Sequence, residues 1–157
     1  GVNGAYLLRG GQEATTATLI DHAAPGATTR EVFKGVLGDR AHGVFLGRIA
    51  VRPGADKTDA HQLNRNLLLS PRAAVDTKPE LEVLADDVKC SHGATVGDLD
   101  AAALFYLISR GIDELAARRM LIEAFAIDAI ETAVPSEALR LHLRRRLGAW
   151  LEQSGSA

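Results

Sequence analysis

The stretch Thr15-Thr16-Ala17-Thr18-Leu19-Ile20-Asp21-His22 decides the class of fold. In an extended chain every second side chain, from Thr16 to His22, faces one side, and the side chains between them face the other. This period of two is typical of a half-buried strand. The first half of the chain is therefore predicted to be built from strands.

Short apolar runs continue through the first half of the chain, and loop signals such as Pro25-Gly26 and Pro53-Gly54 separate them. No segment of helical period and adequate length lies between the runs, which excludes βαβ crossovers. Two architectures stay open, an antiparallel sandwich and a solenoid of stacked coils. The further predicted strands are Val32–Leu37, Gly43–Val51, Asn66–Ser70, Ala73–Asp76 and Leu81–Ala85.

Apolar residues recur with helical spacing after residue 94. Thr95 and Asp98 match a capping box at the start of a first helix. Asp113 would cap a second helix, and a third would end the chain. The sequence thus predicts a β part, residues 1–94, and a helical part, residues 95–157.

Composition limits the classes of partner. A length of 157 residues fits one domain, or one domain with a packed appendage. The formal net charge of −2 argues against nucleic acid as a partner, and no apolar run has the length of a membrane span. A single cysteine excludes an internal disulfide, which favours the reducing cytoplasm.

The only cysteine, Cys90, stands two residues before His92. Thiolate and imidazole suit soft transition metals, but structural zinc and iron–sulfur sites usually take about four ligands. A metal site here would need its other ligands from another chain. The alternative is a small buried thiol beside a hydrogen-bonded imidazole. His42 and His61 fall in segments that read as loops, and no Ser–His–Asp triad is recognisable.

A basic cluster, Arg144, Arg145 and Arg146, lies near Trp150 on the last predicted helix. One interpretation is a solvated helix face that favours the negative end of the helix dipole. The other is a docking surface for a protein partner, because Trp and Arg are enriched at interface hot spots.

Four motifs occur in a fixed order. They are His61-Gln62-Leu63-Asn64-Arg65-Asn66-Leu67-Leu68-Leu69-Ser70, Thr77-Lys78-Pro79-Glu80-Leu81-Glu82-Val83, Ala85-Asp86-Asp87-Val88-Lys89-Cys90-Ser91-His92-Gly93-Ala94-Thr95 and Leu104-Phe105-Tyr106-Leu107-Ile108-Ser109-Arg110-Gly111-Ile112. In sequence and spacing they resemble the SufB/SufD family of iron–sulfur cluster assembly proteins. The likeness is to SufD-like members, since SufB carries a cysteine at the place of Asn64 and a glutamate at the place of Gly93.

The resemblance implies a right-handed parallel β-helix, or β-solenoid, followed by a small helical domain. It implies a non-enzymatic scaffold subunit, and a chain that is the C-terminal core of a longer protein. SufD-like proteins pair with SufB through β-helix edges and bind the SufC ATPase through their C-terminal helices. His92 would then be a ligand of a transient cluster shared with the partner chain, and Cys90 a secondary candidate. No intrinsic cofactor is expected. Within the helices Trp150 and Arg144–Arg146 are the docking candidates.

Two other functions compete with the scaffold. The first is a sulfur-transfer enzyme with Cys90 as nucleophile and His92 as base. The second is a purely structural β-helix homodimer. Both the scaffold and the homodimer need an open strand edge, which is placed at Asn66–Ala85 with Leu67, Leu68 and Leu69 nearby, and the isolated chain is expected to dimerise through it.

Overall fold

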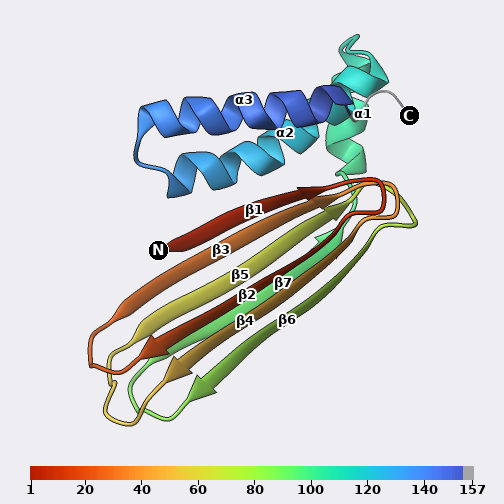
Figure 1. Cartoon of the computed structure of the whole chain (residues 1–157). Coiled ribbons are helices and arrows are strands. Elements are labelled where there is room, and N and C mark those ends of the chain that lie inside the picture. Colours follow the sequence, from red (N-terminus) through yellow and green to blue (C-terminus); the bar gives the residue numbers. More distant parts are fainter. Residues whose placement is uncertain (154–157) are drawn as a thin grey trace.

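The computed structural model describes residues 1–153 (Figure 1), so residues 154–157 of the predicted helical part lie outside it. Within the described residues the strands come first and the helices follow. The strands are β1 (Val2–Leu8), β2 (Glu13–His22), β3 (Thr28–Leu37), β4 (His42–Val51), β5 (Asp59–Leu68), β6 (Ala74–Val83) and β7 (Lys89–Gly97). The helices are α1 (Ala101–Ser109), α2 (Glu114–Ala133) and α3 (Glu137–Gln153).

The strands form a β-solenoid, which decides between the two architectures left open by the sequence. They make two parallel sheets, ordered β1-β3-β5-β7 and β2-β4-β6, so consecutive strands alternate between sheets and the chain winds in coils. Thr28 pairs with Asp59, and Asp59 with Lys89. One coil therefore takes about 30 residues, which is within the usual range of solenoid repeats.

The space between the two sheets, here called the lumen, holds part of the core. Leu37 from β3 and Phe45 and Ile49 from β4 are completely buried there. The rings of Phe33 and Phe45 approach with centroids 5.2 Å apart. The strict alternation of β2 and β4 that the sequence shows is thus the alternation between lumen and outer surface.

Helices α2 and α3 cover the outer face of the first sheet beside β1 and β3 (Figure 1). Lys34, whose side chain is 5% exposed, donates from Nζ to the Phe125 carbonyl at 2.9 Å and to the Asp128 carboxylate at 2.5 Å. No helix among residues 1–153 has the length and apolar character needed to cross a membrane. The apolar contact between the first sheet and these two helices joins Val36 of β3 to Ile122, Ala126, Leu147 and Leu151.

The predicted first helix cap is wrong. Thr95 lies in β7, and Asp100 caps α1 instead, accepting from the backbone N–H of Ala102 at 2.8 Å. The capping-box spacing is a local signal, whereas pairing with β5 extends the strand to Gly97. The predicted cap Asp113 is confirmed, because its carboxylate accepts from the Leu115 N–H at 2.9 Å.

The predicted strands match β2 and β4 closely, β3 over Val32–Leu37, and only parts of β5 and β6. β1 and β7 were not predicted, and β5 begins at Asp59 rather than at Asn66. β6 joins the two predicted strands Ala73–Asp76 and Leu81–Ala85 into one. The backbone N–H groups of Ala74 and Leu84 donate toward β4, so the even-numbered residues of β6 face that strand. By alternation the nitrogen of Pro79 faces the unpaired edge, where no hydrogen-bond donor is needed, and the proline is tolerated.

Candidate functional site at the open end of the solenoid

The last coil ends in two strands with an unpaired side. Among the described strands, β7 pairs only with β5 and β6 only with β4. The N–H of Lys89 donates to the Thr58 carbonyl at 2.8 Å, so by alternation the odd-numbered residues of β7 bond to β5. The backbone groups of Cys90 and His92 therefore face away from β5, toward what we call the open edge.

The side chains of Cys90 and His92 lie on the same face of β7. Cys90 is in register with Ala60, and His92 with Gln62, and both partners in β5 are buried in the lumen. Register and alternation together place Cys90 and His92 over the open end of the lumen. The structure thus brings the predicted pair together, with side chains toward the lumen and backbone groups toward the open edge.

The two side chains have different surroundings. Cys90 is half-buried and packs against an apolar cluster that contains Ile49, Ala55 and Ala60. Burial raises the pKa of the Cys90 thiol, and a hydrogen bond with the Ala60 backbone opposes this in part. His92 is exposed. Of the two, His92 is the donor that an incoming ligand or chain can reach.

No complete metal site is present among residues 1–153, where no group of three or more His, Cys, Asp or Glu residues is placed to hold an ion. Cys90 and His92 supply two donors, fewer than iron–sulfur and structural zinc sites usually need. This end of the molecule therefore presents a thiol and an imidazole on one strand beside an unpaired edge.

A second polar group lies on the outer face of the same strands, and the sequence did not reveal it. His61, read as a loop residue, lies in β5. Its ring contacts the Asp59 carboxylate at 2.8 Å and the Ser91 hydroxyl at 2.5 Å. Arg30 hydrogen-bonds both Asp59 oxygens at 3.0 Å, which lowers the pKa of that carboxyl. This polar ladder ties β3, β5 and β7 together and fixes the strand that carries Cys90 and His92.

Within the predicted edge at Asn66–Ala85, β6 has an unpaired side, but the candidates Leu67, Leu68 and Leu69 do not lie at an open edge. Leu67 and Leu68 belong to β5, which is flanked by β3 and β7, and Leu69 donates to the Leu37 carbonyl at 2.8 Å. An apolar run resembles a pairing template, but here it is already paired. The open edges of this coil are those of β6 and β7.

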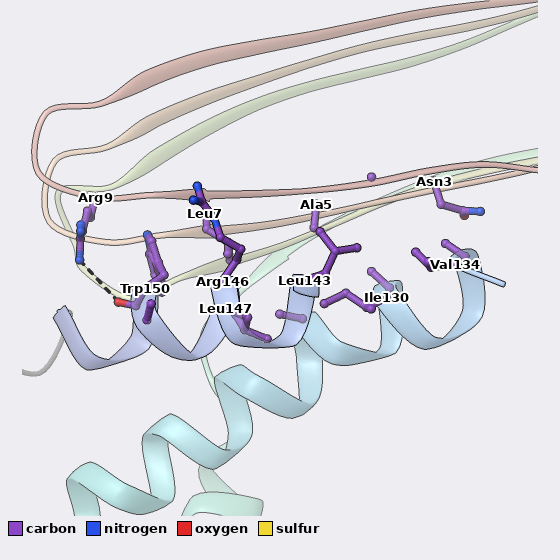
Figure 2. Close-up of a pocket in the computed structure, with 15 residues that line it drawn as sticks. Asn3, Ala5, Leu7, Arg9, Ile130, Val134, Leu143, Arg146, Leu147 and Trp150 are labelled. Carbon is purple, nitrogen blue, oxygen red and sulfur yellow. Dashed lines mark hydrogen bonds between the residues drawn. The ribbon is translucent and has the colours of Figure 1, made fainter. Parts of the chain in front are cut away.

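The last helix provides less free surface than its sequence suggests. Trp150 packs against the core of α2 and α3, and its carbonyl accepts from Arg9 at 3.5 Å (Figure 2). Trp150 is therefore only partly exposed, and its part in docking stays a prediction. Arg144 bonds to Glu131 at 2.5 Å, whereas Arg145 and Arg146 are exposed and stay docking candidates. Arg146 borders a cavity of about 550 Å³ between β1 and the helices.

Helix α1 carries exposed apolar surface that the sequence interpretation missed. It has no buried residue, and Phe105 is 73% and Tyr106 57% exposed. On α2, Leu115 and Met120 are also exposed. The signal was present, since α1 is apolar on nearly every side and a surface helix is usually apolar on one face only.

Comparison with known proteins agrees with this geometry. Residues 1–125 match the family described as SUF system FeS cluster assembly, SufBD core domain. The chain belongs to the SufBD family. The parallel β-solenoid with C-terminal helices is the fold that the resemblance of the four motifs implied.

Two of the relatives compared with this SufBD chain are named as iron–sulfur cluster assembly proteins. It is 45% identical to the iron–sulfur cluster assembly protein SufD of Escherichia coli over 133 residues, which is 85% of this chain and 31% of the relative. It is 42% identical to a SufBD family protein of Synechocystis over 139 residues, 88% of the chain and 30% of the relative. The chloroplastic protein ABCI7 of Arabidopsis thaliana is 42% identical over 130 residues, 82% of the chain and 27% of the relative. The chain spans about a third of the length of these proteins.

Proposed function

We propose that the chain is the cluster-facing part of a scaffold subunit for iron–sulfur cluster assembly and is not itself an enzyme. A SufB-like partner adds its own strands to the open edge of β7 and β6. A nascent cluster, bound only in transit, takes His92 as a ligand from this side, with Cys90 as a secondary ligand. The single unpaired cysteine supports a reducing, cytoplasmic compartment.

One observation carries this proposal: the two soft donors share a strand with an unpaired edge. An unpaired edge recruits another strand, because its N–H and C=O groups need partners. A strand added there would bring its side chains within reach of His92, since paired strands lie about 4.8 Å apart. The incomplete ligand set and the incomplete sheet are thus completed by the same event.

The competing enzyme draws no support from the surroundings of Cys90. A sulfur-transfer nucleophile works as a thiolate and needs a lowered pKa and access. Cys90 is half-buried in an apolar cluster, and burial raises the pKa of its thiol.

The test compares cluster content in a reconstituted complex with a SufB-like protein and a SufC-like ATPase. We expect His92→Ala to abolish cluster assembly with little effect on folding, and Cys90→Ser to have the smaller effect. His142→Ala, which removes another exposed histidine, is the matched control and should retain wild-type iron and sulfide content. Wild-type cluster content in the His92→Ala complex would rule out the ligand role. A melting temperature lowered by several degrees would instead indicate a structural histidine.

We propose further that a SufC-like ATPase binds the apolar surface of α1. Surface of this kind marks an interaction site when its residues are contiguous. Phe105→Ser should weaken binding measured by calorimetry, and Leu139→Ser, an exposed apolar residue of α3, is the matched control. Truncation after Pro135 separates the two helical candidates. If the truncated chain keeps its affinity for the ATPase, Arg145 and Arg146 are not needed for binding. If it stays folded but loses that affinity, α1 alone is not sufficient for binding.

A further inference from the structure

A line of polar side chains runs through the lumen to the open end. Glu31 in β3 is in register with Gln62 in β5, and Gln62 with His92 in β7. All three lie on the lumen side of their strands, one coil apart. Glu31 is completely buried and Gln62 is 2% exposed. Buried polar groups of this kind are usually held by defined hydrogen bonds.

The hydrogen bond between the two buried groups orients the Gln62 amide. Gln62 Nε2 donates to Glu31 Oε2 at 2.6 Å. A carboxylate accepts hydrogen bonds, so Glu31 takes the amide NH₂ group and turns the carbonyl oxygen of Gln62 away from itself. That oxygen, Gln62 Oε1, is buried and has no hydrogen-bond partner among the described residues.

The Gln62 side chain also has little freedom to turn. Gly47 of β4 lies opposite, and a β-carbon at that position would come within 2.3 Å of Gln62 Nε2. A buried acceptor without a partner destabilises the fold, which favours any donor that can reach it. In the next coil His92 is in register with Gln62, and the backbones of paired strands lie about 4.8 Å apart.

We propose that Gln62, oriented by Glu31, accepts a hydrogen bond from a ring N–H of His92 and thereby holds the imidazole with its other nitrogen toward the open edge. Histidine ligands usually donate their second ring N–H to a carboxylate or carbonyl group, which fixes the tautomer and the ring orientation. Gln62 and Glu31 are thus positioning residues. This inference rests on the proposed ligand role of His92.

The test is nitrogen-15 NMR of the histidine rings in the chain without any metal, at pH 8. In the wild type we expect a slowly exchanging ring N–H on His92 and a nuclear Overhauser contact from it to the Gln62 side chain. In Gln62→Met, which keeps the size and removes the acceptor, the His92 ring shifts should move to those of the exposed His142. Glu31→Gln should move them part of the way, because the amide orientation is no longer fixed.

Two internal controls keep the outcomes separate. The ring signals of His61, bonded on the outer face, should not change in any variant and thus report correct folding. His92 shifts equal to those of His142 in the wild type, or unchanged in Gln62→Met, would overturn the hydrogen bond. If the bond is present, cluster content of the Gln62→Met complex should fall by about tenfold, and unchanged content would overturn the positioning role. A failure of His92→Ala to affect cluster content would overturn the ligand role and leave the hydrogen bond standing.

Discussion

Gly47→Ala, a change inside the lumen, should destabilise the chain far more than a glycine-to-alanine change in a helix such as Gly148→Ala. The new β-carbon would lie 2.3 Å from Gln62 Nε2 and 2.7 Å from Phe45 Cε1, whereas non-bonded heavy atoms settle at about 3.5–4.0 Å. Gln62 cannot yield cheaply, because it is buried and bonded to Glu31. Overpacking costs about 1–3 kcal/mol and a lost hydrogen bond to a charged group about 1.5–3 kcal/mol. The reduced freedom of the unfolded chain returns about 0.4–1 kcal/mol.

The net loss in the free energy of unfolding is therefore about 2–5 kcal/mol, a large share of the stability of a domain. Urea unfolding followed by circular dichroism measures it. Gly148→Ala in α3 is the control, since a β-carbon there meets no atom within 4 Å, and it should stabilise by about 0.5–1 kcal/mol. A Gly47→Ala chain as stable as the wild type would refute the close packing of the lumen around Gln62.

Three further predictions concern the helices, acid stability and association. Lys34→Met should lower the free energy of unfolding by about 1.5–3 kcal/mol and make α2 and α3 more sensitive to protease, because Lys34 bonds the Phe125 carbonyl and Asp128; unchanged proteolysis would contradict this anchor. The pKa of Asp59 is lowered mainly by its hydrogen bond with Arg30. This contact therefore stabilises the fold at any pH above the ordinary aspartate pKa of about 4, and its contribution is lost as the pH falls through the lowered pKa of the folded state. Between pH 6 and pH 3 the melting temperature of Arg30→Gln should therefore fall less than that of the wild type. Plots of melting temperature against pH that run parallel for the two chains would contradict this. The isolated chain should be a dimer at micromolar concentration through its unpaired edges, and sedimentation as a clean monomer would exclude edge pairing as its resting state.

The regular part of the fold was readable because its physical cause is local. In β2 and β4 one side of each strand faces the lumen and the other faces outward, so apolar and polar residues alternate strictly. The sequence alone left sandwich and solenoid open, since alternation reports which side is buried and not which strand lies next to it. The four motifs supplied that choice.

β7 escaped prediction because no described strand or helix covers its lumen face. Its lumen face lies at the open end, so few of its residues are buried and no alternation appears in the sequence. Thr95 and Asp98 matched a helix cap, and the pairing with β5 overrides that local preference. The site was therefore found from residue chemistry, whereas the backbone that presents Cys90 and His92 to the open edge was not.

The supporting residues could not be predicted for a different reason. Glu31, Gln62 and His92 are about 30 residues apart in the chain and meet only through the register of the coils. The same holds for Asp59, His61 and Ser91 on the outer face. Without a visible internal repeat, the sequence gives no coil length from which such columns could be computed.

Hydrogen exchange resolved to single backbone amides tests most directly whether the open edge of the last coil receives the partner. In the isolated chain, diluted until sedimentation shows a monomer, Ser91 and Gly93 donate toward β5 and should be protected, whereas Cys90, His92 and Ala94 face the open edge and should exchange fast. In complex with a SufB-like protein, the amides of Cys90, His92 and Ala94 should become protected. The amides at the unpaired edge of β1, at the other end of the same sheet, should keep their exchange rates. Unchanged exchange at Cys90 and His92 in a complex that is shown to be assembled would contradict the account.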